Sequence, residues 1–281
     1  MTRVFIILLC MVLFLPLEAF AGFWVDDWSN AAYYETNGEN ANFRSALFRG
    51  ETRFGYQPEE NFTAMPYVVL YETYGQDANY WNNNLAYGLG VRLLPFNLFK
   101  SDSVFLDWIP STKFYGEILA LTFLKDTATA TANGVKTDDF RFGIDVWHEW
   151  NLQKTDANLF WAEMWANFTY RNTNFYDDLN FDKFQTYVGY FQFKLGRPIF
   201  NGLMPYAALY VNKSGSGAEW LNNVFYGIGL RIEPFREKEE IAPIFRKLKM
   251  FAEFLNMYWF NESSTRPKTD FRFGIELTQG R

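Results

Sequence analysis

The stretch Leu85-Ala86-Tyr87-Gly88-Leu89-Gly90-Val91-Arg92-Leu93 decides the fold. Large apolar side chains alternate with small or charged ones, which is the period of a strand that has one apolar and one polar face. The stretch returns as Val224-Phe225-Tyr226-Gly227-Ile228-Gly229-Leu230-Arg231-Ile232. The two copies are 139 residues apart (226 − 87), so the chain carries a duplicated β unit.

The repeat continues on both sides of these stretches. Met65-Pro66-Tyr67 returns as Met204-Pro205-Tyr206, and Phe140-Arg141-Phe142-Gly143-Ile144 returns as Phe271-Arg272-Phe273-Gly274-Ile275. We therefore expect two internal repeats, residues 22–150 and 151–281, each with six strands. The strands are expected near residues 23–34, 43–57, 65–75, 84–94, 112–124, 138–150, 159–172, 183–197, 203–213, 223–233, 247–260 and 269–279.

Residues 1–21 are interpreted as a cleaved signal peptide. Thr2-Arg3 is a short basic start, the apolar run from Val4 to Pro16 is too short to span a bilayer comfortably, and Ala19-Phe20-Ala21 is a small-x-small cleavage site. The one cysteine, Cys10, lies in this segment. We expect an exported mature domain, residues 22–281, without disulfides or thiolate metal sites.

The composition limits the class of protein. Aromatic residues make up 21% of the chain, and the net charge is −6. No stretch of the expected mature domain is long and apolar enough for a transmembrane helix, and the negative charge argues against nucleic acid as a partner. An aromatic-rich, exported β chain is typical of an outer-membrane barrel, and the competing class is a secreted or periplasmic β-sandwich.

Three features favour the barrel. Glycines such as Gly88 and Gly143 lie in the middle of the polar face, which suits a crowded and curved interior. Tyr, Trp and Phe are concentrated at the strand ends, and the apolar faces carry no charge. We therefore predict an all-β fold, a single 12-stranded antiparallel up-and-down transmembrane β-barrel in the lipid of the bacterial outer membrane.

The polar face of each predicted strand is expected to line the lumen. Opposite charges there would either pair and plug the barrel or form a narrow polar channel, and the sequence leaves both open. Trp161 and Trp165 on this face would offer stacking surfaces for sugar rings or would fill space. The charged residues assigned to the lumen are Arg49, Glu51, Arg53, Glu72, Arg92, Glu117, Arg141, Asp145, Glu163, Lys194, Arg231, Glu253, Arg272 and Glu276.

The sequence offers no catalytic or metal-binding pattern. His148 is the one histidine, and it lies at the end of a predicted strand, where a structural role is the more common outcome. Neither a nucleophile elbow nor a phosphate-binding loop is present. We expect a non-enzymatic protein that needs no cofactor.

Two long connections, residues 95–111 and 234–246, follow equivalent strands, and both begin with Pro-Phe. They are expected on the periplasmic side if both termini lie there. Their apolar residues predict short amphipathic elements at the membrane interface, and the alternative is a docking surface for a periplasmic partner.

The blocks Gly88–Phe96 and Gly227–Phe235, with the two Phe-Arg-Phe-Gly-Ile segments, resemble small bacterial outer-membrane β-barrel proteins. More loosely, they are similar to the barrel domains of exopolysaccharide-export systems and of the phage adsorption protein A type. The resemblance implies a narrow channel or export conduit for a hydrophilic solute, such as an exopolysaccharide. Two alternatives stay open: a structural or receptor barrel with a plugged lumen, and a soluble periplasmic sugar-binding β-sandwich.

Overall fold

The fold is known from a computed structural model, which describes residues 22–37, 43–57, 64–77, 79–101, 103, 106–151, 160–173, 186–199, 202–215, 221–236, 238, 240–260 and 268–279. The expected signal peptide lies outside these residues. No helix among them is long and apolar enough to cross a membrane.

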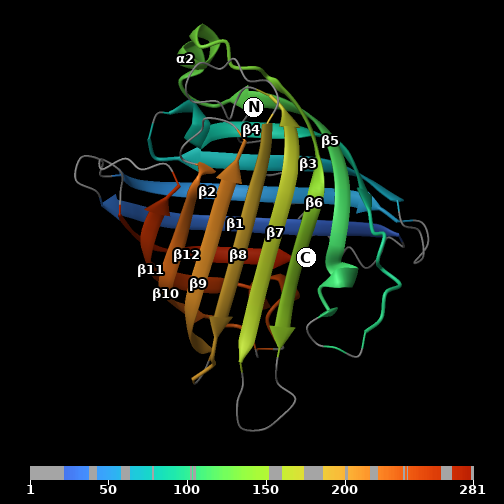
Figure 1. Ribbon diagram of the computed structural model, residues 1–281, viewed down its shortest axis with the longest axis vertical. Coiled ribbons are helices and arrows are strands. Elements are labelled where there is room, and N and C mark those ends of the chain that lie inside the picture. The colour runs from blue at the N-terminus through green and yellow to red at the C-terminus, as the bar shows by residue number, and fades with distance from the viewer. Residues whose placement is uncertain are drawn as a thin grey trace.

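One closed antiparallel sheet accounts for all the strands in the described residues (Figure 1). Each strand pairs with its neighbours in the chain, and the predicted bounds agree to within a few residues. In Figure 1 the strands of the near wall cross those of the far wall, because the strands of a barrel are tilted. The strands are β1 (Phe23–Asn37), β2 (Phe43–Tyr56), β3 (Ala64–Gly75), β4 (Asn83–Leu93), β5 (Thr112–Phe123), β6 (Asp138–Asn151), β7 (Trp161–Asn172), β8 (Thr186–Gly196), β9 (Leu203–Ser214), β10 (Asn223–Ile232), β11 (Lys249–Trp259) and β12 (Thr269–Gln279).

The barrel closes where β1 pairs with β12. Their register runs from Asp27 opposite Gln279 to Asn37 opposite Thr269. The first strand is therefore present, and the alternative of a two-sheet sandwich is wrong. The prediction of a 12-stranded antiparallel up-and-down barrel is confirmed.

Most apolar side chains of the strands point out of the barrel, and most of the charged ones point into it. On the outer face Leu89 is 67% exposed, and Ile118 and Ile228 are each 69% exposed. On the inner face Glu117 and Glu163 are each 1% exposed. This distribution is the reverse of that in a soluble protein and matches a wall that faces hydrocarbon.

Short helical elements lie in the connections. On one side are the 3-10 turn η2 (Tyr80–Asn82) and the helix α2 (Thr127–Ala132), which lies beyond the end of the barrel in Figure 1. On the other side, the predicted long links contain the 3-10 turn η4 (Ile109–Ser111) and the helix α3 (Pro243–Arg246).

The outward orientation of Leu89 generates a direct prediction. Replacing Leu89 with Arg is expected to lower the free energy of unfolding in phospholipid vesicles by about 2–4 kcal/mol, because the guanidinium group would face hydrocarbon. Urea titration followed by tryptophan fluorescence measures this change.

Thr122→Arg is the matched control, since Thr122 is also exposed on the outer face but lies near the end of β5. Its cost is expected to be about 0–1 kcal/mol. Equal and negligible costs for both variants would contradict a lipid-facing wall.

Candidate functional site

The structure places the charged residues predicted for the lumen on the inner face, with one exception. Glu72 lies opposite Gly50, on the same outward face as Val68, which is 50% exposed. The assignment of Glu72 to the lumen is therefore wrong. Arg49 lies on the inner face in the middle of β2, with its guanidinium carbon 5.7 Å from the centre of the Tyr34 ring.

Adjacent Asp26 and Asp27 divide between the two faces of β1. Asp26 points inward, and its carboxylate accepts a 2.7 Å hydrogen bond from Arg92. Asp27 points outward and accepts a 2.6 Å hydrogen bond from the Thr52 hydroxyl. The carboxylates of Asp27 and Glu72 thus both lie on the outer face, in a region that is otherwise largely apolar.

Glu117 is the centre of one inner cluster. The Tyr67 hydroxyl donates to its carboxylate at 2.7 Å, and the Tyr71 hydroxyl donates at 2.8 Å. Arg53 lies 3.4 Å from one carboxylate oxygen and Arg141 lies 3.8 Å from the other. We call these five residues the Glu117 cluster. A carboxylate that takes two hydroxyl donors and two cations is well compensated for its burial.

Glu253 is the centre of a second inner cluster with the same kinds of partners. The hydroxyls of Tyr206 and Tyr210 donate to its carboxylate at 2.7 and 2.5 Å. Lys194 lies 3.9 Å and Arg272 lies 3.6 Å from its oxygens. We call these residues the Glu253 cluster. Its two tyrosines stand 139 residues after Tyr67 and Tyr71 (206 − 67 and 210 − 71).

A cation stacked on tryptophan accompanies each cluster. Arg92 lies 4.3 Å from the centre of the Trp24 ring and pairs with Asp26. Arg231 lies 4.1 Å from the centre of the Trp161 ring and pairs with Glu163 at 2.8 Å.

The remaining predicted residues join these networks. Glu51 pairs with Arg53, and Glu276 lies 3.6 Å from Lys249, which also pairs with Glu163 at 3.1 Å. Asp145 accepts a 2.8 Å hydrogen bond from the Trp165 indole.

The two tryptophans predicted for sugar stacking are occupied by protein groups. Trp161 is 2% exposed and lies beneath Arg231. The Trp165 ring packs against Tyr190, with the ring centres 4.7 Å apart. In this conformation, their rings pack against neighbouring side chains of the barrel.

Glycine makes the tyrosine contacts possible. Tyr67, Gly90 and Glu117 lie in one row across β3, β4 and β5. The Tyr67 ring lies across Gly90 to reach the carboxylate, so a Cβ on Gly90 would come within 2.4 Å of the ring. The Tyr206 ring lies across Gly229 in the same way, and a Cβ on Gly229 would come within 2.4 Å of that ring.

Sequence reasoning missed these four tyrosines as partners of the glutamates. A signal was available, because the Met-Pro-Tyr block and the Gly-x-Gly block both repeat at 139 residues. Their combination indicates a ring that covers a glycine on the neighbouring strand.

The inner charges leave little room for solvent. Arg53 is 4%, Arg231 is 2% and Glu253 is 2% exposed, although all three are ionisable. The side chains at the centre of the two clusters are therefore largely shielded from solvent.

Among the described residues, Ser111 and Trp150 are the polar and aromatic contacts found for the His148 ring. The His148 ring lies at the end of β6, where Nδ1 is 3.4 Å from the Ser111 hydroxyl and the ring packs edge-on against Trp150. Within the described ranges, no group of three or more His, Cys, Asp or Glu side chains could hold a metal ion.

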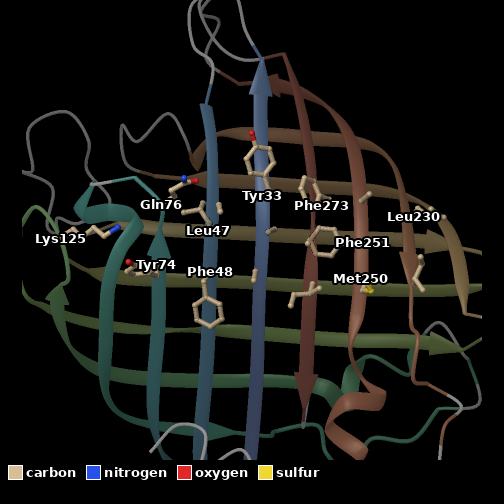
Figure 2. Close-up of a pocket in the computed structure, with 17 residues that line it drawn as sticks. Tyr33, Leu47, Phe48, Tyr74, Gln76, Lys125, Leu230, Met250, Phe251 and Phe273 are labelled. Carbon is tan, nitrogen blue, oxygen red and sulfur yellow. The ribbon is translucent and has the colours of Figure 1, made fainter. Parts of the chain in front are cut away.

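A shallow apolar depression of about 870 Å³ crosses the outer wall from β3 to β10. Figure 2 shows its lining side chains spread over these neighbouring strands, including Phe48, Tyr33 and Phe273. Ala31 and Ala46 are small enough to create the dip. The depression belongs to the apolar outer wall and offers no chemistry of its own.

Comparisons with known proteins add little. No protein-family model matches the sequence, and no curated protein does. Among solved structures, the chain is similar to the β domain of the Bordetella autotransporter BrkA, with 13% identity, a TM-score of 0.39 and coverage of 90% of this chain and 98% of that one. It is also similar to the KdgM porin, with 9% identity, a TM-score of 0.37 and coverage of 91% of this chain and 99% of that one. A third similar structure is the outer-membrane channel DcaP of Acinetobacter baumannii, with 9% identity, a TM-score of 0.38 and coverage of 92% of this chain and 97% of that one.

Similarity at this level supports no conclusion about activity, so the fold rests on the strand pairing. The resemblance to exopolysaccharide-export and phage adsorption barrels stays a prediction.

The packing of Tyr67 on Gly90 can be tested by one methyl group. Gly90→Ala is expected to destabilise the folded barrel by about 1–3 kcal/mol, because the added Cβ displaces the ring that holds Glu117. The temperature at which the folded band converts to the unfolded band in a gel-shift assay measures the loss.

Gly116→Ala is the control, because a Cβ there meets one backbone oxygen at 4.0 Å and nothing closer. It is expected to leave the conversion temperature unchanged. Equal behaviour of the two variants would contradict the role given to Gly90.

Proposed function

We propose that this protein is a non-enzymatic barrel of the bacterial outer membrane whose lumen is closed at rest by the Glu117 and Glu253 clusters. A hydrophilic solute passes only when these clusters rearrange. The proposal combines the apolar outer face, which suits a bilayer, with the polar inner face, which suits a solute path.

The observation that carries the proposal is the burial of the central carboxylates. Glu117 is 1% and Glu253 is 2% exposed, and each is held by two hydroxyls and two cations. A standing aqueous pore would expose such charges to water. Breaking one partnership leaves an uncompensated buried charge, so the closed arrangement is strongly favoured over partial opening.

The identity of the solute stays open within this proposal. An exopolysaccharide, as the sequence resemblance implies, is a linear polar chain that would need both clusters to separate along the barrel. The polar residues of the inner face would then contact it.

A second candidate, a surface receptor, is favoured by the ordered loops at the η2 end. Tyr80 and Ala130 are each 1% exposed and pack with Val135, which ties the β3–β4 and β5–β6 connections together. Lys125 donates to the backbone oxygens of Gly75 and Asp77 at 2.9 and 3.2 Å. Such a packed loop platform would offer a defined surface to a partner.

Planar bilayer recordings test the closed lumen. The unaltered protein is expected to show no conductance. The double variant Glu117→Gln/Glu253→Gln is expected to raise the open probability about tenfold or more, because each change weakens charged hydrogen bonds worth about 1.5–3 kcal/mol. Tyr71→Phe/Tyr210→Phe removes hydroxyls alone and serves if the first variant does not fold.

Glu72→Gln is the control for lost charge, since Glu72 lies on the outer face. It is expected to stay silent. A steady conductance of the unaltered protein would contradict the closed lumen.

A further inference from the structure

A polar pocket opens at the mouth of the barrel on the side of the long links. Its volume is about 390 Å³, at the small end of the range for small-molecule sites. Three parts of the chain that are distant in sequence build it: the end of β6, the segment from the end of β10 through helix α3 to the start of β11, and the end of β12.

The pocket is basic although the whole chain is acidic. Four cationic residues line it against two glutamates, Glu149 and Glu233, while the chain carries a net charge of −6. Its cationic residues are Arg236, Arg246, Lys247 and Lys249.

Part of this charge is already used inside the protein. Glu233 lies 3.6 Å from Arg231 and 3.3 Å from Arg236. Lys249 pairs with Glu163 at 3.1 Å and with Glu276 at 3.6 Å. These pairs hold Glu233, Arg236 and Lys249, three of the residues that line the pocket.

Two cations remain for a ligand. Arg246 donates its Nε–H to the Ile241 backbone oxygen at 3.2 Å, which orients the guanidinium group, and no carboxylate of the described residues lies within 4 Å of it. Lys247 is exposed, and the described part of the chain gives it no ion pair within 4 Å. An oriented guanidinium with a lysine beside it matches a carboxylate or a phosphate.

The wall of the pocket adds a flat apolar surface. Trp147 points inward at the end of β6 and lines the pocket. An indole next to fixed cations suits a ring that carries an acidic group, because the ring packs on the indole while the acid meets the cations.

The repeat supplies a second argument. The link at 95–111, which stands in the equivalent place, contains one basic residue, Lys100. The inner pairs are alike in the two halves, because Arg92 and Lys113 pair with Asp26 as Arg231 and Lys249 pair with Glu163. Arg246 and Lys247 have no basic counterpart, since Pro110 and Ser111 stand at the equivalent positions before Glu117. Basic residues that are present in one of two otherwise equivalent links indicate a specific role for that link.

We propose that this pocket binds the carboxylate or phosphate of an acidic saccharide, with its ring against Trp147 and its acid on Arg246 and Lys247. The inference rests on the proposed function and deepens it, because it names the class of solute that would be met at this mouth of the barrel.

Calorimetric titration of the folded, detergent-solubilised barrel tests the proposal. Glucuronate and glucose 6-phosphate are the probes for the two acids, and glucose is the neutral comparison. Both acidic sugars are expected to bind and glucose is not. Arg246→Gln and Lys247→Gln are each expected to raise the Kd about tenfold or more, since each removes a charged hydrogen bond.

Lys100→Gln is the matched control, because it removes one positive charge from the link on the same side. It is expected to leave the Kd unchanged. Trp147→Ala is expected to weaken both acidic sugars and to leave inorganic phosphate unaffected.

The proposal is overturned if neither acidic sugar binds. It is also overturned if the Lys100 and Lys247 variants lose the same amount of affinity for the acidic sugars. Each variant is first shown to be folded by its heat-dependent gel shift. A barrel that is folded and silent in bilayers, yet binds neither sugar, overturns this inference and leaves the proposed function standing.

Discussion

The pairing of β1 with β12 is the constraint on which the rest of this structure depends. Hydrocarbon cannot satisfy backbone N–H and C=O groups, so a sheet that crosses a membrane must have no free edge. The register from Asp27–Gln279 to Asn37–Thr269 removes that edge. Once the sheet is closed, alternation sends every second side chain into a confined interior, and the outer face must be apolar.

The confined interior explains the rows of tyrosine, glycine and glutamate. The strand between a tyrosine and its glutamate must carry no side chain at that level, and Gly90 and Gly229 meet this need. The tyrosine hydroxyls and neighbouring cations then compensate the buried carboxylates. The buried charges, the inner glycines and the inner tyrosines therefore depend on one another: the glycines make room for the rings, and the rings hold the carboxylates.

Much of the fold could be predicted from the sequence, because the alternation of apolar and polar side chains can be recognised within each single strand. The prediction failed for Glu72, because both faces of β3 are largely apolar and the strand alone does not reveal which one points outward. The contact of Tyr67 with Glu117 spans three strands, so it depends on register between strands rather than on any one strand. The basic pocket unites β6, α3, β11 and β12, which only the closed barrel brings together.

The central claim is that one face of each strand meets lipid and the other is enclosed. The expected mature domain contains no cysteine, so single cysteines on β4 can carry spin labels in lipid vesicles. Gly88 and Gly90 are left unlabelled, because neither has room for a side chain. The account predicts that collision with oxygen is high at Tyr87, Leu89 and Val91 on the outer face and low at Ala86 and Arg92 on the inner face. Uniform values along the stretch, or strong collision with a water-soluble relaxing agent at Leu89, would contradict it.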